Sequence, residues 1–424
     1  MKKSVAIIGT GISGLTAAYK LNRLCDITVF EKSDRIGGHT ATVDFDLDGK
    51  SYAIDTGFIV FNDWTYPNFI RLLDEIGVQA QPTSMGFSVS CAESGLEYAG
   101  NGLNALFAQR ANLVSPRFLG MLKDIIRFNY SAERDLLNGT IPKDMTLGAY
   151  LDEKGYGEVF ARYYLVPMGA AIWSASLANM RNFPIQFFVS FFRNHGLLNI
   201  FNRPQWRVIK GGSKQYLGPL TEDFSERIET NAQIKTIKRH NRHVVIVFDD
   251  GAERVFDDVV LATHSDEALA LLSDATSEEQ EVLSAIPYEE NSATLHYDES
   301  LLPHSKRTWS SWNYRMTGAA DEARLPIVTY DMNILQGLDS TEGKTFCVSL
   351  NADEFINPEK VIGRYRYAHP QFTEAGAKAQ SRWPEINGQR NTWYCGAYWA
   401  NGFHEDGVVS GLRVAERFCA SIND

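Results

Sequence analysis

The chain has 424 residues, of which 44% are hydrophobic and 22% are charged. These proportions exclude a disordered chain, a collagen-like fibre and a mucin-like stalk, and the length fits two joined domains of about 100–200 residues each. The 41 basic and 52 acidic residues give a formal net charge of −11. This balance argues against a general nucleic-acid-binding protein, because such proteins need a basic surface.

The five cysteines are scattered and form no Cys-x-x-Cys pair, which is typical of a reducing compartment rather than a disulfide framework. Glycines interrupt the first apolar run, and no small-residue cleavage site follows it, so we expect no signal peptide. No apolar run reaches the roughly 18 residues of a membrane-spanning helix. We expect a soluble, cytoplasmic protein that at most contacts the inner face of a membrane peripherally.

The N-terminal segment predicts one βαβ unit. Residues 5–9 form a short apolar run that ends in glycine, residues 13–24 have helical spacing, and residues 27–31 form a second β-branched run. Residues 50–55 indicate a further strand. Residues 66–77 indicate a helix with one apolar face and with glycine as its C-cap.

Residues 100–200 have a mainly helical pattern, in which five phenylalanines between 183 and 192 fall on one helical stripe. The tail predicts a strand at 392–396 and a helix at 407–422. Strand-like patterns also occur at residues 232–238, 244–249, 259–262, 291–297, 327–331 and 345–350. This order predicts an α/β protein with interleaved domains.

A glycine-rich turn lies between the first strand and the first helix. Gly9 permits a tight turn, Gly11 lets the backbone approach a pyrophosphate, and Gly14 lets helix and strand pack closely. The helix N-terminus offers free N–H groups and the positive end of its dipole to phosphates. Glu31 lies 20 positions beyond Gly11, where a carboxylate holds a ribose hydroxyl. This context predicts a dinucleotide cofactor, either FAD or NAD.

A second glycine-rich run follows Glu31. Arg35 precedes Gly37, Gly38 and His39, and its planar guanidinium can neutralise a pyrophosphate while the glycines allow a close backbone approach. The alternative is a solvated turn in which the glycines only reverse the chain.

These motifs, together with Asp55-Thr56-Gly57, resemble the flavin amine oxidase superfamily, which includes phytoene-desaturase-like and protoporphyrinogen-oxidase-like proteins. The resemblance implies non-covalently bound FAD rather than NAD. It continues at residues 210–213, 232–234, 259–264, 394–397 and 407–411. It assigns the following residues to FAD: Gly9, Gly11, Ser13, Gly14, Glu31, Lys32, Arg35, Gly37, Gly38, His39, Gly57, Phe58, Ile234, Thr263, Gly396, Gly407 and Val408.

The resemblance implies a Rossmann-type FAD-binding domain interleaved with an α+β substrate domain, as in amine oxidases. We expect the FAD-binding domain to comprise residues 1–65, 205–290 and 390–424. The substrate domain is then expected at residues 66–204 and 291–389. The backbone at Ile234 would meet the adenine, and the N-terminus of the last helix would face the flavin ring at the domain junction.

The sequence departs from the superfamily at several positions. Ala397 stands where an acid is usual, so backbone N–H groups would have to replace that contact, and His39 stands where arginine is frequent. We place no lysine near flavin N5, where many amine oxidases have one. Tyr398 and Trp399 stand near the place of the aromatic residues that flank the flavin in amine oxidases.

Three further runs, at 167–174, 309–314 and 402–407, resemble a bacterial group of flavoproteins known as predicted NAD/FAD-binding proteins. Members of this group accompany cyclopropane-fatty-acid-synthase-like methyltransferases. The resemblance therefore implies oxidation or desaturation of a modified fatty acyl chain.

His404 is the first candidate for a catalytic side chain, as a proton acceptor or substrate orienter, with Tyr398 and Trp399 as aromatic partners. The alternative for His404 is a packing role in the turn before the last helix. Glu405 and Asp406 are expected to cap that helix.

His264 is expected to be a hydrogen-bonded core histidine. Cys395 is expected to be a small buried hydrophobe, although its place near the flavin also allows a covalent link. We find no cluster of His, Cys, Asp and Glu with metal-ligand spacing, so we expect no metal.

No Asp or Glu occurs between residues 159 and 221, whereas seven Lys or Arg and twelve aromatic residues do. Basic residues beside an apolar helical face are typical of a peripheral contact with an anionic membrane, which we place at 181–207. The alternative is a core stripe that lines the substrate cavity. Both interpretations indicate an apolar or lipid-like substrate. From the acidic net charge, we expect no nucleic-acid partner.

We therefore expect an FAD-dependent oxidoreductase that transfers a hydride from a substrate C–H to flavin N5. The expected reaction is oxidation or desaturation of a lipid-like acyl substrate. Two alternatives remain: a flavin amine oxidase acting on a small amine or polyamine, and an isomerase or structural flavoprotein without net redox turnover.

Overall fold

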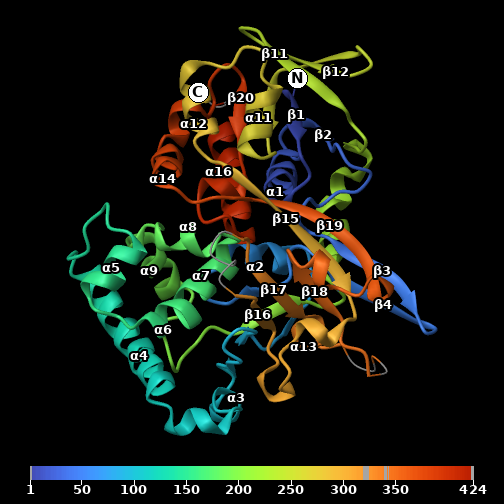
Figure 1. The fold of residues 1–424 in the computed structure, drawn as a ribbon. Helices are drawn as coiled ribbons and strands as arrows, with labels where there is room; N and C mark the ends of the chain where they lie inside the picture. Colours follow the sequence, from blue (N-terminus) through green and yellow to red (C-terminus); the bar gives the residue numbers. More distant parts are fainter. Residues whose placement is uncertain (1, 319–323, 339–340, 342, 422–424) are drawn as a thin grey trace.

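The computed structural model describes residues 2–318, 324–338, 341 and 343–421. Figure 1 shows an upper part that contains both chain ends, above a lower part in which helices lie on one side of a sheet. The chain passes between the two parts several times, so each part is assembled from separate segments.

The upper part is built on a five-stranded parallel sheet with the order β10-β2-β1-β14-β20. From β1, the chain runs through α1 (Ile12–Leu21) to β2 on one side, whereas β14 flanks the other side of β1. The position where chain connections lead to opposite sides of the sheet is a topological switch point. Ligands of α/β proteins bind at the carboxyl ends of the strands there. The strands are β1 (Ser4–Ile8), β2 (Asp26–Phe30), β10 (Ile228–Glu229), β14 (Asp258–Leu261) and β20 (Thr392–Tyr394).

Helices α1 and α16 (His404–Ser421) pack closely against each other beside this sheet. A Cβ atom on Gly407 would lie 2.6 Å from the Ile12 side chain, and one on Gly411 would lie 2.5 Å from the Ser13 carbonyl oxygen. Any larger residue at either position would push the helices apart. Since α1 follows β1 and α16 follows β20, both helix N-termini lie at the carboxyl edge of the sheet.

Smaller elements complete the upper part. A three-stranded antiparallel sheet contains β11, β12 and β13, and a second small sheet has the order β5-β9-β6. The elements are β5 (Phe61–Asn62), β6 (Ala80–Pro82), β9 (Trp206–Ile209), β11 (Ile234–Arg239), β12 (Val244–Phe248), β13 (Glu253–Phe256), α2 (Pro67–Glu75), α10 (Leu217–Thr221), α11 (Ser265–Leu271), α12 (Ser277–Ser284), α14 (Glu374–Ser381) and α15 (Trp383–Ile386).

The lower part contains a seven-stranded mixed sheet with the order β19-β15-β18-β17-β16-β7-β8. Figure 1 shows β15 and β19 running from this sheet towards the upper part, and a β3–β4 hairpin beside them. The strands are β3 (Thr42–Leu47), β4 (Lys50–Asp55), β7 (Phe87–Cys91), β8 (Glu97–Ala99), β15 (Tyr288–His296), β16 (Trp312–Met316), β17 (Ile327–Asp331), β18 (Cys347–Leu350) and β19 (Val361–Pro370), with helix α13 (Met332–Gln336) following β17.

A group of helices lies beside the lower sheet, and we call it the helical part. Its elements are α3 (Leu103–Leu106), α4 (Pro116–Leu137), α5 (Leu147–Glu153), α6 (Glu158–Phe160), α7 (Val166–Trp173), α8 (Leu177–Arg181) and α9 (Ile185–Asn194). A π-helical turn, Ala161–Leu165, connects α6 to α7.

The elements predicted from apolar periodicity are present, including β1, α1, β2, α2 and α16, and the α/β fold class is confirmed. Gly77 has a φ of 72° directly after α2, as expected of a helix-ending glycine. Strand β19 was not predicted from the sequence. Its burial pattern, mostly half-buried with few clear alternations, lacks the regular period of two that predicts a strand.

The predicted domain boundaries stay a prediction, and two of the segments that we assigned to the substrate domain pack into the upper core. Phe69, Leu72 and Leu73 of α2 contact that core, as do Ala379 of α14 and Trp383 of α15. Their apolar faces have no other large apolar surface to cover, because the main core of the helical part is formed by separate residues.

The phenylalanine stripe is a core feature of the helical part. Phe183, Phe188, Phe191 and Phe192 on and before α9 are at most 5% exposed, and Phe187 is half-buried. These side chains therefore do not face a membrane. The peripheral contact through 181–207 stays a prediction, since Ile200 and Phe201 are exposed there.

No helix in the described ranges is long and apolar enough to cross a membrane. In the same ranges, no three His, Cys, Asp or Glu side chains are grouped in a way that would hold a metal ion.

Replacement of a stripe residue should destabilise the helical part. We expect Phe188→Ala to lower the free energy of unfolding by about 3–5 kcal/mol, because it leaves a cavity in a packed core. Phe201→Ala, at a side chain that is 86% exposed, should change it by less than about 0.5 kcal/mol. Chemical denaturation followed by circular dichroism measures both values. Equal effects of the two substitutions would contradict the assignment of the stripe to the core.

Candidate cofactor and substrate site

The first glycine turn has the close contacts that the motif predicts. A Cβ atom on Gly9 would lie 2.8 Å from the Ala262 carbonyl oxygen, and one on Gly14 would lie 2.0 Å from the Gly9 carbonyl oxygen. Gly9 also has a φ of 105°, which favours glycine. Gly11 differs, because no atom lies within 4 Å of the place of its Cβ. Neighbouring protein atoms therefore leave no room for a side chain at Gly9 or Gly14, whereas the space beside Gly11 is open.

The N-terminus of α1 faces this opening without a protein cap. Its N-cap residue is Gly11, no side chain accepts a hydrogen bond from the first turn, and the first turn contains no acidic residue. Ser13 lies in that turn and is buried. Free N–H groups and the helix dipole together favour an anion, so this end of α1 fits a diphosphate.

The second glycine run packs against the first. The Gly37 N–H donates to the Thr10 carbonyl oxygen at 3.1 Å, and a Cβ on Gly38 would lie 3.2 Å from the Gly11 Cα. The Arg35 guanidinium donates to the carbonyl oxygens of Thr40 and Gly38, which holds its charge beside this turn.

Glu31 lies at the carboxyl end of β2. Its carboxylate accepts hydrogen bonds from the N–H and hydroxyl of Thr10 and from the Ser33 N–H. A carboxylate accepts about four hydrogen bonds, so Glu31 retains capacity for a ribose hydroxyl. Residues 231–233 run alongside, since the Ala232 N–H donates to the Glu31 carbonyl oxygen and the Gln233 amide donates to that of Lys32. Ile234 follows directly, which places it next to Glu31 as an adenine contact requires.

Other predicted residues lie along the carboxyl edge of the sheet. The Phe58 N–H donates to the His39 carbonyl oxygen at 2.7 Å, and a Cβ on Gly57 would lie 2.2 Å from that oxygen. Thr263 follows β14, and the Gly396 N–H after β20 donates to the Ser410 hydroxyl. Gly407 serves the contact between α1 and α16, and Val408 is fully buried beside it.

Three buried polar atoms at this edge lack a hydrogen-bond partner of standard geometry among the described residues. They are the Ser265 hydroxyl, the Tyr398 hydroxyl and the Trp399 indole N–H. Native proteins satisfy most buried polar groups, so these atoms mark a place where a bound group would supply partners. Tyr398 and Trp399 pack into the upper core at this edge.

Several histidines surround the second glycine run. The His39 ring lies 5.6 Å from the His369 ring and 6.0 Å from the His264 ring. Removal from water and the neighbouring His369 and His264 rings hold the pKa of His39 below its usual range. Burial lowers the pKa of His369 to about 4. His264 stacks on Tyr288 at 4.4 Å and precedes α11.

His404 is buried at the start of α16. Its ring stacks on Phe58 with a centroid distance of 3.6 Å, and its Nε2 lies 2.9 Å from the Tyr216 hydroxyl and 3.3 Å from the Thr40 hydroxyl. Burial lowers the pKa of His404 to about 3. A neutral ring whose Nε2 already has two partners is a weak proton acceptor, so this geometry favours a positioning role.

The two acids after His404 have different partners. Asp406 accepts from the Phe403 N–H at 2.9 Å, which is the N-terminal cap expected for α16. The expectation that Glu405 also caps α16 is wrong. Its carboxylate accepts from the N–H groups of Asn68 and Phe69 and therefore caps α2, because α2 begins within reach of the first turn of α16.

The Cys395 thiol is buried at the end of β20, and burial raises its pKa to about 12. A thiol that stays protonated is a poor nucleophile. This environment gives no support to a covalent link between Cys395 and a cofactor.

An aromatic cluster that the sequence analysis missed connects the helical part to α16. Phe187 stacks on Phe372 at 5.4 Å, and Phe191 stacks on Phe403 at 5.2 Å. His195 stacks on Phe191 at 3.9 Å. We call these five residues the junction cluster. Its members come from α9, from the segment after β19 and from the residue before α16, so only the fold brings them together.

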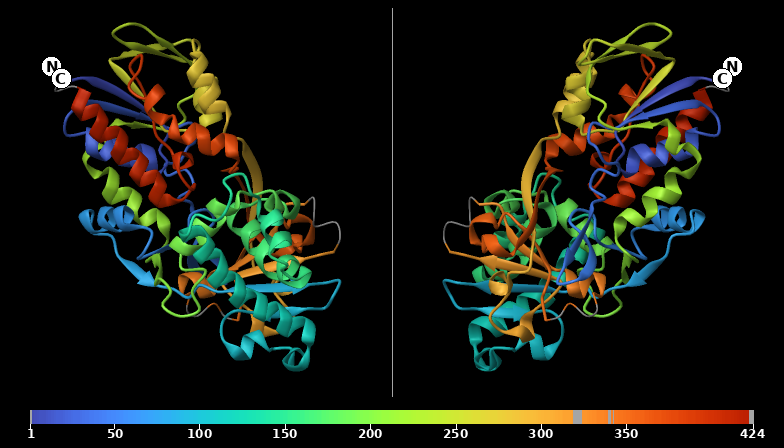
Figure 2. Two further views of the ribbon diagram at one scale, coloured as in Figure 1. Left: turned by 90° about the vertical axis from the view of Figure 1, so that its left-hand side faces the viewer. Right: turned by 90° about the vertical axis from the view of Figure 1, so that its right-hand side faces the viewer.

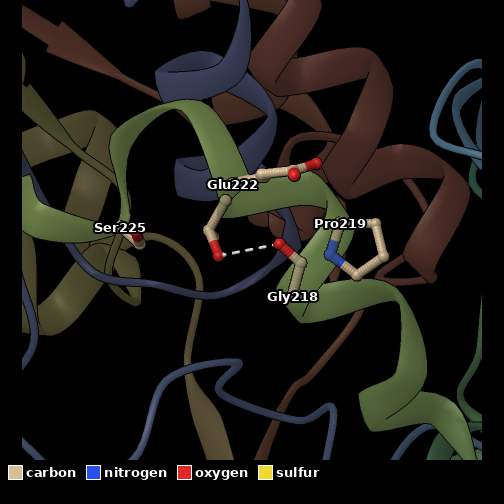
Figure 3. A pocket seen from close by; sticks show the side chains of 5 residues that line it. Gly218, Pro219, Glu222 and Ser225 are labelled. Atoms are coloured by element: carbon tan, nitrogen blue, oxygen red, sulfur yellow. Dashed lines mark hydrogen bonds between the residues drawn. The ribbon is translucent and has the colours of Figure 1, made fainter.

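A surface hollow beside α10 is separate from this site. Figure 3 shows its lining, with the Thr221 hydroxyl donating to the Gly218 carbonyl oxygen. The hollow lies near the C-terminal end of α1, where the Asn22 amide donates to the Asp223 carbonyl oxygen. None of the predicted site residues lines it. Its lining residues are Gly218, Pro219, Thr221, Glu222 and Ser225.

Comparison with known proteins agrees with this geometry. The family of flavin-containing amine oxidoreductases matches residues 12–419. The chain belongs to this family. The Mycobacterium tuberculosis protein AofH, named for flavin-containing monoamine oxidase activity, is 22% identical over 98% of this chain and 96% of its own length. The predicted resemblance to the superfamily is thus confirmed, whereas the association with methyltransferases stays a prediction.

Two solved structures of related fold cover nearly the whole amine oxidoreductase chain. A fatty acid isomerase from P. acnes has a TM-score of 0.69 and 17% identity, with 98% of both chains covered. Cyclohexylamine oxidase from Brevibacterium oxydans has a TM-score of 0.70 and 15% identity, with 100% of both chains covered. At these identities the likeness shows the fold alone.

Proteins of the flavin-containing amine oxidoreductase family use FAD, and the residues described above fit it. The open position at Gly11 and the uncapped α1 suit the diphosphate, and Glu31 suits the ribose. The individual roles of the predicted site residues, and non-covalent attachment of FAD, stay predictions.

Substitution of Gly11 should separate cofactor binding from folding. Gly11 has a φ of −63° and open space at its Cβ position, so Gly11→Ala should leave the unfolding temperature of the apoprotein unchanged. The methyl group should weaken FAD binding about tenfold or more, because hydrogen bonds to charged groups contribute about 1.5–3 kcal/mol each. Titration of flavin fluorescence measures the affinity. Gly120→Ala, also at an open position, is the control, and equal affinities in the two variants would contradict the assignment.

The buried His404 should make stability depend on pH. Its pKa is about 3 in the folded protein and 6.5 ordinarily, so between these values the unfolded chain binds a proton that the folded chain does not. The stabilisation is full above pH 6.5 and is lost as the pH falls. His404→Gln should reduce the slope of unfolding free energy by up to about 1.4 kcal/mol per pH unit in this window. Urea denaturation across pH, with exposed His240→Gln as control, tests this; identical slopes would contradict it.

Proposed function

We propose that this FAD-dependent oxidoreductase oxidises or desaturates an apolar, lipid-like acyl substrate. The observation that carries the proposal is the junction cluster, which joins an aromatic wall directly to the N-terminus of α16. Aromatic and apolar side chains line sites for apolar ligands, with a few placed polar groups for orientation. Phe187, Phe372 and Phe403 are only half-buried, so their faces remain available to a substrate.

The charges around the cluster favour an uncharged substrate segment. The nearest acids along the chain are Glu374, Glu405 and Asp406. Glu374 forms an ion pair with Lys378, and the other two carboxylates accept hydrogen bonds from backbone N–H groups. Burial lowers the pKa of His195 to about 4, which leaves it neutral at pH 7. No hydrogen bond or ion pair within the described part of the chain brings another carboxylate to the cluster residues. A protonated amine would therefore find no carboxylate partner there.

Trp173 supplies one polar group beside the cluster. Its ring lies 4.8 Å from the Phe191 ring, and its buried indole N–H has no hydrogen-bond partner among the described residues. A lone donor in an apolar surround suits a substrate with a single acceptor group, such as an acyl carbonyl or carboxylate.

FAD, when bound, supplies the acceptor for a hydride from a substrate C–H. Desaturation also releases a proton from the neighbouring carbon, and we assign its acceptance to His195. The Nδ1 of His195 lies 3.0 Å from the Phe191 carbonyl oxygen. Because a carbonyl oxygen only accepts, Nδ1 carries the hydrogen and Nε2 keeps its lone pair. Among the described residues, no hydrogen bond uses the Nε2 of His195, so this atom is better suited to accept a proton than the Nε2 of His404.

The junction cluster also has a physical role in the reaction. Its packed rings exclude water from the reacting carbon and restrict the motion of a flexible chain, which favours a productive orientation. Because Phe403 directly precedes α16, a substrate held against it lies next to the helix end assigned to the flavin.

Two other functions have specific support. The 22% identity with AofH over nearly the full length favours amine oxidation. The shared fold with a fatty acid isomerase favours return of the hydride to the substrate, with movement of a double bond and no net oxidation. Both use the same FAD site and differ in the substrate or in the fate of the hydride.

Anaerobic reduction of the bound flavin distinguishes these functions. We expect fatty acyl lipids, and not small amines or polyamines, to bleach the flavin absorbance, with an unsaturated acyl product. His195→Gln should slow the reduction by about 10²–10⁴-fold, the usual contribution of a positioned proton acceptor, and should leave FAD content unchanged. His240→Gln, in an exposed hairpin, is the control.

Each alternative outcome identifies a different enzyme. Bleaching by amines and not by lipids would overturn the proposal in favour of amine oxidation. Formation of a positional isomer of an unsaturated acyl lipid without loss of flavin absorbance would favour an isomerase. A reduction rate that is the same in His195→Gln and wild type would remove His195 from the mechanism.

A further inference from the structure

Exposed apolar side chains are concentrated in one segment of the helical part. Of the thirteen large apolar side chains that are exposed in the described ranges, seven lie between residues 103 and 137. Single exposed apolar residues are ordinary, whereas a contiguous group marks an interaction surface. Four of the seven lie on α4, and we call these four residues the α4 face: Leu119, Ile126, Tyr130 and Leu137. The other three, Leu103, Leu113 and Val114, precede this helix.

Helix α4 has two apolar sides. Leu119, Ile126, Tyr130 and Leu137 are spaced by seven, four and seven residues, so at about 100° per residue they lie within about 40° of one another. The inner side includes Phe118, Met121 and Phe128, which are at most 3% exposed. The inner side anchors the helix, and the outer stripe makes no contribution to the core. The left panel of Figure 2 shows α4 on the outer side of the helical part, facing the viewer.

Basic side chains border the α4 face. Lys123, Arg127 and Arg134 are exposed, and at about 100° per residue they lie about 40–80° around α4 from Leu119, along one side of the stripe. Residues 98–123 contain no Asp or Glu. Lys123 has no ion pair with any described residue.

Each of the three acidic side chains of α4 forms an ion pair with an Arg or Lys side chain. Asp124 pairs with Arg127, and Asp135 pairs with Lys154 and Arg134. Glu133 pairs with Arg193 of α9. The rim of the face is therefore basic, although the whole chain has a net charge of −11.

We propose that the α4 face docks on the surface of an anionic lipid bilayer, with α4 lying parallel to the bilayer plane. Apolar side chains would insert at the level of the headgroups, while the basic rim contacts the anionic headgroups. Tyr130 suits this depth, because its ring is apolar and its hydroxyl is polar. The acidic remainder of the protein is repelled by the same surface, which fixes the orientation.

A second copy of the chain fits the α4 face less well. In a two-fold dimer the same patch meets itself, so the rims containing Lys123, Arg127 and Arg134 would face each other. Like charges across an interface oppose association. Anionic lipid accepts both the apolar stripe and the basic rim, so charge complementarity favours the bilayer.

The docked orientation also relates to the proposed substrate, although the proposal does not depend on it. Phe128, on the inner side of α4, lies 6.4 Å from Phe188 of α9, and α9 carries Phe187 and Phe191 of the junction cluster. Docking through α4 would therefore hold the helix that carries the substrate wall close to a source of acyl chains.

Flotation of the FAD-loaded full-length protein with lipid vesicles tests the proposal. We expect binding to vesicles of equal parts phosphatidylglycerol and phosphatidylcholine, and weak binding to phosphatidylcholine alone. The double variant Ile126→Glu, Tyr130→Glu should lower the partition coefficient about tenfold or more, because it removes apolar insertion and adds repulsion. The matched control Leu24→Glu, Val255→Glu changes two exposed apolar residues outside this face and should stay within about twofold of wild type.

Flavin content and unfolding temperature establish that both double variants are folded, and no step of the test requires turnover. Absence of wild-type binding to anionic vesicles would overturn the proposal. An equal loss of binding in both double variants would also overturn it, since total charge would then explain the result. A wild-type dimer that becomes monomeric only in the Ile126→Glu, Tyr130→Glu variant would assign the face to a second copy instead.

Discussion

The close contact between α1 and α16 determines the geometry of the whole site. Gly407 and Gly411 permit it, because a Cβ atom at either position would overlap with α1. Helices with ordinary side chains at the contact stay about 8–10 Å apart, so glycine brings them closer. Both helix N-termini then lie at the switch point of the parallel sheet. Two positive dipole ends at one place favour an elongated anionic cofactor, and the remaining chain is arranged around that position.

This arrangement supplies positive potential without buried cations. His39, His369 and His404 all have lowered pKa values because they are removed from water, so at pH 7 these rings are neutral. Arg35 lies beside them and donates to backbone carbonyl oxygens. Oriented backbone dipoles, which are fixed by the fold and lose little energy to desolvation, therefore favour a diphosphate here together with the exposed Arg35 guanidinium. Neutral imidazoles also pack against aromatic rings, as His404 does on Phe58.

The sequence predicts those parts of the fold that depend on local patterns. The βαβ unit with Gly9, Gly11, Gly14 and Glu31 can be recognised in the sequence, because its strand, turn, helix and carboxylate are close along the chain. The junction cluster is not readable, because Phe187, Phe372 and Phe403 meet only after distant segments fold together. The role of Glu405 was missed for the same reason, since its partner Asn68 lies 337 residues away. The sequence allowed two interpretations of the phenylalanine stripe, a membrane contact or a packed core. Only the burial of its side chains distinguishes them.

The interleaving of the domains follows from what the site requires. The residues predicted to bind FAD come from the ends of β1, β2, β14 and β20, whereas the junction cluster needs α9 and the end of β19 beside α16. A chain that completed one domain before starting the other would connect them through one linker and leave their relative position free. Here β15 and β19 pair over nine residues and run between the two parts. Repeated crossings fix the junction cluster against the N-terminus of α16, so packing in the helical part determines how these two elements lie relative to each other.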